Sequence, residues 1–151
     1  MKKHTYRVEY SQITPYIFLG TNLCCGIHFN KIQKLGIEAD IDLELIRAHD
    51  PAKKLKMFLW LPTKDRTAPT QEQLKAGVAA IDALVKARVK TYVHCRLGHG
   101  RSPTLVAAYF VSKGMTVPDA IKKIKLKRPE IHLFAPQLKA LKSFAKKVKI
   151  S

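Results

Sequence analysis

The chain has 151 residues, of which 46% are hydrophobic and 26% are charged, as is typical of a globular protein large enough to bury a core. No apolar stretch approaches the length of a membrane span, and the basic N-terminus lacks the apolar run of a signal peptide. The formal net charge is +17, from 28 Lys and Arg against 11 Asp and Glu, and such a field concentrates anions at the surface. Three cysteines, two of them adjacent, make a poor disulfide framework, so we expect one cytoplasmic domain over residues 1–151.

Strands and helices are predicted to alternate along the chain. Strands are expected at residues 16–19, 37–43, 56–60 and 91–93. Helices are expected over residues 22–35, from Thr70, over residues 104–111, from Thr116, and from about Pro136 towards Val148. Thr70 and Gln73 form a capping-box pair, and a polar stretch around residues 49–51 separates the second and third strands. This order predicts an α/β fold with a central, mainly parallel sheet of four to five strands flanked by helices on both faces.

The most informative segment is residues 94–104, His-Cys-Arg-Leu-Gly-His-Gly-Arg-Ser-Pro-Thr, which lies between a predicted strand and a predicted helix. Its glycines allow tight turns that point successive N–H groups inward, and the helix start adds free N–H groups and a positive dipole end. A phosphoryl group would fit such a loop, with Arg101 closing it by a bidentate fork. A cysteine and an arginine at this separation can also occur by chance, but the added glycines, histidine and serine favour a functional loop.

Each residue of this loop has an expected role. Cys95 is the candidate nucleophile, and we expect it to ionise readily because helix N-termini and nearby cations stabilise a thiolate. Ser102 can donate a hydrogen bond to the sulfur, and His94 is expected to buttress the loop as a buried, hydrogen-bonded side chain. The expected phosphate-binding residues are Arg96, Leu97, Gly98, His99, Gly100 and Arg101.

A thiolate nucleophile also needs a proton donor for the leaving oxygen. Asp65 lies in the loop after the strand predicted at 56–60 and should therefore emerge at the same sheet edge as Cys95. Alone, Asp65 would be read as a turn former beside Pro62 and Pro69, but its pairing with the Cys–Arg loop favours the acid role. Asp82 is a weaker rival because it should lie within a helix.

Other polar residues carry weaker signals. Cys24 and Cys25 are expected to be ordinary packed thiols, and the six histidines show no metal-ligand spacing, so no metal is predicted. Lysines recur at helical spacing near the C-terminus, which favours a solvated helix face. The alternative is contact with nucleic acid, an acidic membrane surface or a polyanionic substrate. These basic residues are Lys122, Lys123, Lys125, Lys127, Arg128, Lys139, Lys142, Lys146, Lys147 and Lys149.

These motifs resemble the dual-specificity branch of the cysteine-dependent protein tyrosine phosphatases, especially its small, single-domain, VH1-like atypical members. The resemblance lies in residues 94–104, the loop at 61–65, the opening segment 11–20, and the closing segment 128–131 followed by Gln137. It implies a protein tyrosine phosphatase-like fold and no cofactor. It also implies two steps: Cys95 attacks phosphorus while Asp65 protonates the leaving oxygen, and water then hydrolyses the phosphocysteine with Asp65 as base. Gln137 either positions that water or simply begins the last helix.

The resemblance leaves the substrate open. The long recognition loop of the tyrosine-specific enzymes is missing, so a shallow pocket should admit phosphoserine and phosphothreonine as well as phosphotyrosine in a protein, which is the first expectation. Basic residues at 96 and 99 resemble the phosphatase and tensin homologue lipid phosphatases, which act on phosphoinositides. The further alternatives are an inositol-phosphate phosphatase, an RNA 5′-phosphatase and a non-catalytic phosphate-binding module. Phosphate-like oxyanions are expected to bind the loop and inhibit.

Overall fold

The computed structural model describes residues 7–46 and 55–150. The polar stretch predicted around residues 49–51 and most of the basic N-terminus lie outside these ranges.

The described strands form one five-stranded sheet in the order β1-β2-β5-β3-β4. The strands are β1 (Tyr10–Thr14), β2 (Ile17–Gly20), β3 (Ile37–Asp42), β4 (Met57–Trp60) and β5 (Lys90–His94). The pair β1–β2 is antiparallel and the other three pairs are parallel. The predicted α/β fold with a mainly parallel sheet is therefore confirmed.

The strand β1 was not predicted, because the sequence indicates a strand only over residues 16–19 of the opening segment 11–20. Pro15 interrupts this segment, since proline has no N–H to donate to a sheet ladder. The hydroxyl of Thr14 accepts hydrogen bonds from the N–H groups of Tyr16 and Ile17, at 3.3 and 3.0 Å. These bonds close a tight turn, and the chain folds back on itself as a hairpin.

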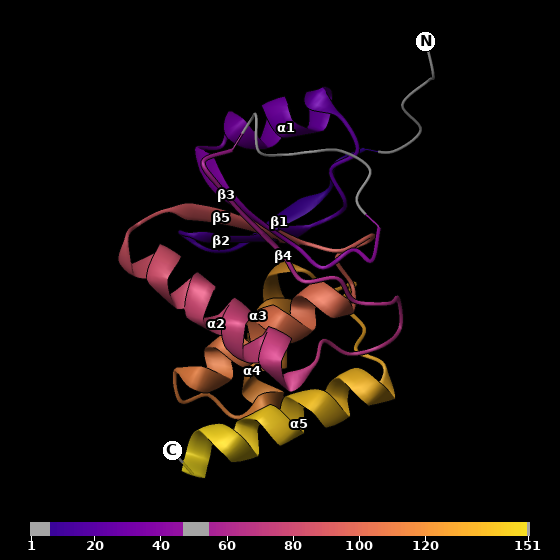
Figure 1. Cartoon of the computed structure of the whole chain (residues 1–151), viewed down its shortest axis with the longest axis vertical. Coiled ribbons are helices and arrows are strands. Elements are labelled where there is room, and N and C mark those ends of the chain that lie inside the picture. Colours follow the sequence, from indigo (N-terminus) through magenta and orange to yellow (C-terminus); the bar gives the residue numbers. More distant parts are fainter. Residues whose placement is uncertain (1–6, 47–54, 151) are drawn as a thin grey trace.

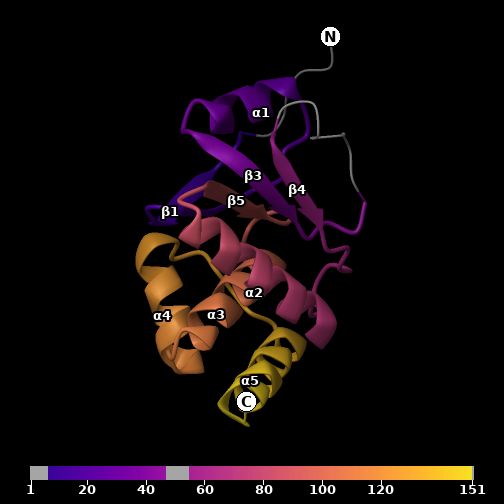
Figure 2. The ribbon, with the colours of Figure 1, turned by 60° about the vertical axis from the view of Figure 1, so that its left-hand side comes forward.

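Helices cover both faces of the sheet, as Figures 1 and 2 show. The helices in the described ranges are α1 (Gly26–Gln33), α2 (Gln71–Lys86), α3 (Arg101–Ser112), α4 (Val117–Lys127) and α5 (Ala135–Ile150). On one face α1 packs Phe29 and Ile32 against Phe18 of β2. On the other, α2–α5 enclose the larger core, in which the apolar α3 is central. No described helix combines the length and the apolar character needed to cross a membrane.

Two helix starts follow local capping signals, and two others differ from the sequence prediction. The capping box of Thr70 and Gln73 is present, and the Thr116 hydroxyl caps α4. The helix predicted over 22–35 begins only at Gly26, because the Asn22 N–H donates to the carbonyl of Arg96 at 3.1 Å and keeps this segment extended. The core helix begins at Arg101, three residues before the predicted start, since Pro103 is tolerated in a first turn.

The parallel strands end at one edge of the sheet. Gly20 pairs with His94, His94 pairs with Asp42, and Asp42 pairs with Trp60. The loops that follow these four strands therefore meet at the carboxyl edge, where ligands bind in open α/β sheets.

Candidate active site

The nucleophile candidate lies where β5 passes into the loop before α3. The Cys95 side chain is buried, and its Sγ lies 3.2 Å from the Oγ of Ser102 in the first turn of α3. Because α3 begins immediately after the loop, its free N–H groups and positive dipole end face the same region. The structure thus places a sulfur, a hydroxyl and a helix N-terminus together, as the sequence predicted.

The backbone of this loop is oriented by hydrogen bonds. The carbonyls of residues 96–100 all accept hydrogen bonds from outside the loop. Their donors are the N–H groups of Asn22, His132 and Thr104, the Thr104 hydroxyl and the guanidinium of Arg128. By contrast, no group in the described ranges accepts a hydrogen bond from the N–H groups of residues 96–101. The loop therefore offers a set of unused backbone donors, which is the arrangement that binds an anion.

The segments that follow β3 and β4 hold Arg101. The guanidinium is only 3% exposed, and its Nη1 donates to the carbonyls of Thr63 at 2.8 Å and Leu43 at 3.4 Å. Its Nη2 lies 3.2 Å from Oε1 of Glu44 and 3.6 Å from Oδ1 of Asp65. Sequence reasoning missed Glu44, although its position just beyond the end of a buried strand was a usable signal. These contacts fix the orientation of the planar guanidinium group of Arg101.

Asp65 lies in the loop between β4 and α2, and its side chain is 65% exposed. Its Oδ1 accepts a hydrogen bond from the N–H of Arg66 at 2.9 Å, and the residue lines the same cavity as Cys95. The weaker rival Asp82 pairs instead with Lys86 and Lys113 on the outside of α2. Of the two carboxylates, only Asp65 lies at the candidate site.

Arg128 is a supporting residue whose role the sequence did not reveal, because it was counted only among the basic residues and in the closing segment. Its guanidinium is buried, and it donates from Nε to the carbonyl of Gly98 at 2.9 Å and from Nη2 to that of Leu97 at 2.7 Å. A third bond runs from Nη1 to the hydroxyl of Ser11 at 3.3 Å. The available signal was that Arg128 follows the buried Ile124 by four residues, at a position where a helix would place another apolar side chain.

His94 is buried beneath the loop as expected, but neither of its ring nitrogens makes a hydrogen bond within the described residues, so ion pairing takes the place of the predicted hydrogen-bonded buttress. Its Nε2 lies 2.7 Å from Oδ1 of Asp40, and its Nδ1 lies 3.8 Å from Oδ1 of Asp42. Burial alone lowers the pKa of His94, but these negative charges outweigh it and raise the pKa to about 9. Burial also raises the pKa of Asp42, whose Oδ1 accepts from the N–H of Glu44 at 2.7 Å. His94 is thus connected, through the Asp42 carboxylate of β3, to Glu44, which contacts Arg101.

Gln137 lies in the first turn of α5 and also lines the cavity that contains Cys95, so both interpretations of it are compatible with its position. Its Oε1 accepts from the N–H of Phe134 at 2.9 Å, and its Nε2 donates to the carbonyl of Thr67 at 3.1 Å. The side chain therefore joins the closing segment to the loop that carries Asp65.

The cavity at the loop has a volume of about 270 Å³. It is lined by Asp65, Arg66, Cys95, Arg96, Leu97, His99, Gly100, Arg101, His132, Phe134 and Gln137. Burial and the charge of Arg128 lower the pKa of His99, so at neutral pH the loop's positive charge comes from Arg96 and Arg101. A sulfur nucleophile, a fixed guanidinium, backbone donors and a carboxylate at the mouth suit transfer of a phosphoryl group.

Comparison with known proteins agrees with this geometry. A model of the dual specificity phosphatase catalytic domain matches residues 17–147. The chain belongs to this family. It is therefore a cysteine-dependent phosphatase of the protein tyrosine phosphatase superfamily, and the non-catalytic binding module is set aside.

The similar proteins include lipid phosphatases. The human phosphatidylglycerophosphatase and protein-tyrosine phosphatase 1 is 37% identical over 153 residues, covering 95% of this chain and 76% of the human one. The Arabidopsis thaliana phosphatidylglycerophosphate phosphatase PTPMT2 is 30% identical over 148 residues, and the match spans 91% of this chain but only 63% of the plant protein. A crystal structure of PTPMT1 superposes with a TM-score of 0.83 at 26% identity, covering 94% of this chain and 97% of that one.

Proposed function

We propose that this phosphatase hydrolyses phosphate monoesters through a phosphocysteine intermediate at Cys95. The sulfur attacks phosphorus in line, an S–P bond forms, and the P–O bond to the leaving group breaks as Asp65 gives its proton to that oxygen. Water then attacks the phosphocysteine with Asp65 as base, and the Ser102 hydroxyl, 3.2 Å away, stabilises the departing thiolate.

The observation that carries this proposal is the outward hydrogen bonding of the loop carbonyls, which leaves the N–H groups of residues 96–101 for the phosphoryl oxygens. Such preorganised donors stabilise the charge of the transition state without reorganising during the reaction. Arg101 supplies a positive charge for the same phosphoryl oxygens. Its guanidinium is held in position because Nη1 donates to the carbonyls of Leu43 and Thr63.

Substitution of the nucleophile and the acid tests the proposal. Cys95→Ser should abolish turnover of an aryl phosphate while inorganic phosphate still binds, and continued turnover would contradict the nucleophile assignment. Asp65→Asn should slow alkyl phosphates, which are poor leaving groups, about 10²–10⁴-fold and activated aryl phosphates far less. Asp82→Asn is the matched control, since Asp82 pairs with lysines away from the cavity. Equal losses for both leaving groups would argue against an acid role.

For the substrate class, the lipid alternative has more support than the protein substrate expected first. Both curated relatives described above are named as phosphatases of phosphatidylglycerophosphate. In addition, large apolar side chains are exposed near the catalytic edge. They are Leu45, Ile46, Trp60 and Leu97, with exposed fractions of 48%, 78%, 40% and 54%.

These apolar residues are connected to the site. The indole of Trp60 donates to the carbonyl of Glu44 at 2.7 Å, and Glu44 contacts Arg101. Leu97 lines the catalytic cavity itself. An apolar rim around a cationic cavity fits a phosphate monoester on an anionic lipid, whose chains contact the rim while the headgroup enters.

A phosphorylated protein remains a second candidate, because the human relative is also named a protein-tyrosine phosphatase. The decisive assay compares vesicles of phosphatidylglycerophosphate with a phosphotyrosine peptide, an inositol phosphate and RNA ending in a 5′-triphosphate. A higher kcat/KM on the vesicles, lowered selectively by Leu45→Ser with Ile46→Ser, would support the lipid class. A higher kcat/KM on the peptide, unchanged by these substitutions, would favour the protein class.

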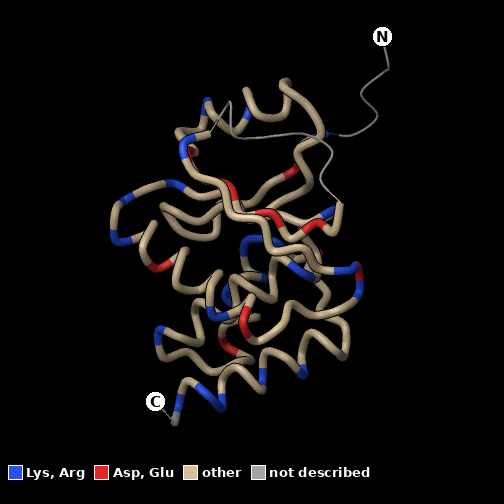
Figure 3. The backbone as a smooth tube through the Cα atoms, in the orientation of Figure 1, with Lys and Arg blue, Asp and Glu red and all other residues tan. Residues whose placement is uncertain are grey.

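The basic residues of α4 and α5 offer a second source of attraction for an anionic lipid substrate. Lysines are exposed along α4 and α5, and Figure 3 shows basic positions recurring along α5. We propose that they add electrostatic attraction to an anionic lipid surface. Lys142→Glu with Lys146→Glu should then weaken activity on anionic vesicles at low salt and leave a soluble aryl phosphate unaffected.

A further inference from the structure

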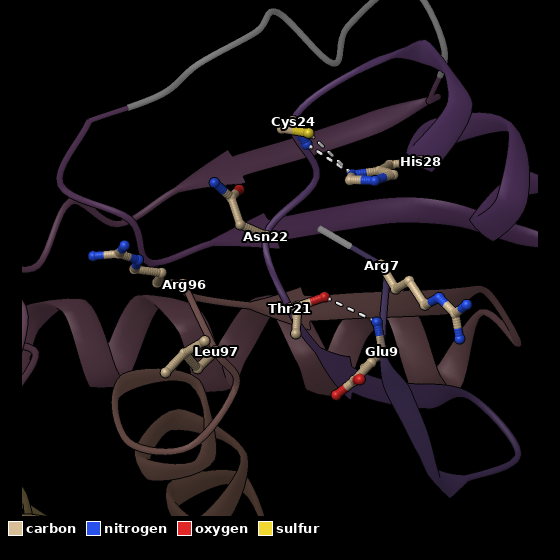
Figure 4. Close-up of a pocket in the computed structure, with 8 residues that line it drawn as sticks. All are labelled: Arg7, Glu9, Thr21, Asn22, Cys24, His28, Arg96 and Leu97. Carbon is tan, nitrogen blue, oxygen red and sulfur yellow. Dashed lines mark hydrogen bonds between the residues drawn. The ribbon is translucent and has the colours of Figure 1, made fainter. Parts of the chain in front are cut away.

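A second cavity, of about 550 Å³, lies beside the catalytic loop and shares Arg96 and Leu97 with the catalytic cavity. Figure 4 shows its lining, in which Cys24 and His28 point toward each other. Cys24 belongs to the segment between β2 and α1, and His28 to the first turn of α1. The assigned mechanism uses neither residue.

Three metal-ligating side chains converge here: Cys24 and His28, which line the cavity, and the neighbouring Cys25. The Sγ atoms of Cys24 and Cys25 and a ring nitrogen of His28 all lie within 4.8 Å of one another. The Sγ of Cys24 is 3.3 Å from Nδ1 of His28. Bond lengths of about 2.3 Å for Zn–S and about 2.0–2.1 Å for Zn–N place sulfur and nitrogen roughly 3.5 Å apart around a tetrahedral ion. The observed spacing needs little adjustment.

The imidazole already presents the nitrogen that a metal needs. Its Nδ1 accepts a hydrogen bond from the N–H of Cys24 at 3.1 Å, so in the neutral ring the proton lies on Nε2. Nδ1 is therefore the unprotonated ring nitrogen, and a bound ion would take over its lone pair from the N–H of Cys24. His28 is buried, whereas both cysteines are partly accessible, so an ion could reach the sulfurs from solvent.

The two thiols benefit from a cation. The two cysteines are adjacent in the chain and partly buried, and two neighbouring thiolates repel each other where water is partly excluded. A divalent ion replaces the two protons and neutralises the pair.

We propose that Cys24, Cys25 and His28 bind a transition-metal ion of the zinc type, with three protein ligands and one position open to the cavity. Two thiolates and an imidazole select Zn²⁺ or a similarly soft ion over the hard cations Mg²⁺ and Ca²⁺. This departs from the expectation that the two cysteines are ordinary packed thiols. The sequence did not suggest it because a Cys-Cys-x-x-His run lacks the two separated ligand pairs of familiar zinc sites.

The site would act on structure rather than on the reacting phosphate. It lies in the segment whose Asn22 N–H donates to the carbonyl of Arg96 at 3.1 Å. A bound ion would fix this segment and so help to hold one carbonyl of the catalytic loop in its outward orientation.

The test uses the full chain carrying Cys95→Ser, so that the catalytic thiolate cannot bind the metal. Titration with Co²⁺ should give one equivalent of binding with a thiolate-to-cobalt charge-transfer band, and Zn²⁺ should displace it. In this background Cys24→Ser, Cys25→Ser and His28→Ala should each weaken binding and diminish the band. His132→Gln, a histidine of the catalytic cavity, is the matched control and should retain both. A band unaffected by the three substitutions, or retained only when His132 is present, would overturn the proposal.

A second measurement leaves the three proposed ligands in place and so does not depend on how their variants fold. X-ray absorption of the Zn²⁺-loaded Cys95→Ser protein should show two sulfur scatterers at about 2.3 Å and one nitrogen at about 2.0–2.1 Å. Zinc surrounded only by oxygen and nitrogen, or failure of Zn²⁺ to bind under reducing conditions, would refute the site.

Discussion

Gly98→Ala is the sharpest perturbation of the catalytic loop that leaves every functional side chain in place. Gly98 has φ +69°, and a Cβ on it would lie 2.6 Å from the carbonyl oxygen and 2.8 Å from the carbonyl carbon of Gly20. These are backbone atoms of β2, so no side-chain rotation can relieve the overlap.

The expected cost has two parts. A left-handed conformation costs a residue with a Cβ about 1–2 kcal/mol, and overpacking against fixed atoms costs about 1–3 kcal/mol more. Gly98→Ala should therefore lower the free energy of unfolding by about 2–5 kcal/mol. Gly114→Ala is the matched control: its φ is +101°, but a Cβ there meets nothing within 4 Å. Gly114→Ala should lower the free energy of unfolding by the conformational part alone, about 1–2 kcal/mol.

Urea denaturation and turnover of an aryl phosphate separate the two effects. Shifting the backbone at Gly98 misaligns the loop N–H groups, and losing one such donor costs about 10²–10³-fold in kcat. We expect a loss of that size in Gly98→Ala and wild-type kcat/KM in Gly114→Ala. If Gly98→Ala kept wild-type kcat/KM, or lost no more stability than Gly114→Ala, the argument from the fit of the loop against β2 would be wrong.

Three further predictions follow from buried or capping contacts. The pKa of His94 rises from its ordinary 6.5 to about 9 on folding. Its contribution to the free energy of unfolding, about 3 kcal/mol, is therefore complete below pH 6.5 and is lost as the pH rises through about 9. His94→Gln should flatten this dependence of the unfolding free energy on pH, measured by denaturation at several pH values, and an unchanged dependence would contradict a charged imidazole. Arg128→Met leaves the carbonyls of Leu97 and Gly98 without their donor. It should lower the free energy of unfolding by about 2–3 kcal/mol and weaken phosphate binding measured by calorimetry. Unaltered binding would mean that Arg128 does not support the loop. Thr70→Ala removes a capping box and should cost about 1 kcal/mol in thermal denaturation with unchanged kcat/KM.

Signals confined to a few neighbouring residues could be read directly from the chain. The capping residues Thr70 and Thr116 begin helices as predicted, and the alternation of strands and helices indicated the α/β fold. The Cys–Arg segment between a strand and a helix likewise indicated the candidate catalytic loop, because its turns, its helix N-terminus and the side chains of Cys95 and Arg101 all belong to one short stretch.

The support of that loop was decided by the tertiary structure. Arg101 is held by carbonyls in the segments that follow β3 and β4, and Arg128 reaches the loop from the end of α4, 30 residues after Gly98. The start of α1 was mispredicted because a hydrogen bond to Arg96 overrides local helix preference. The contacts of Arg101 and Asn22 depend on β5 lying between β2 and β3 in the sheet, and that of Arg128 depends on where α4 packs. Hydrophobic periodicity and capping report on neighbours within a turn or two of chain, whereas the partners of a buried cation depend on which distant strands become adjacent on folding.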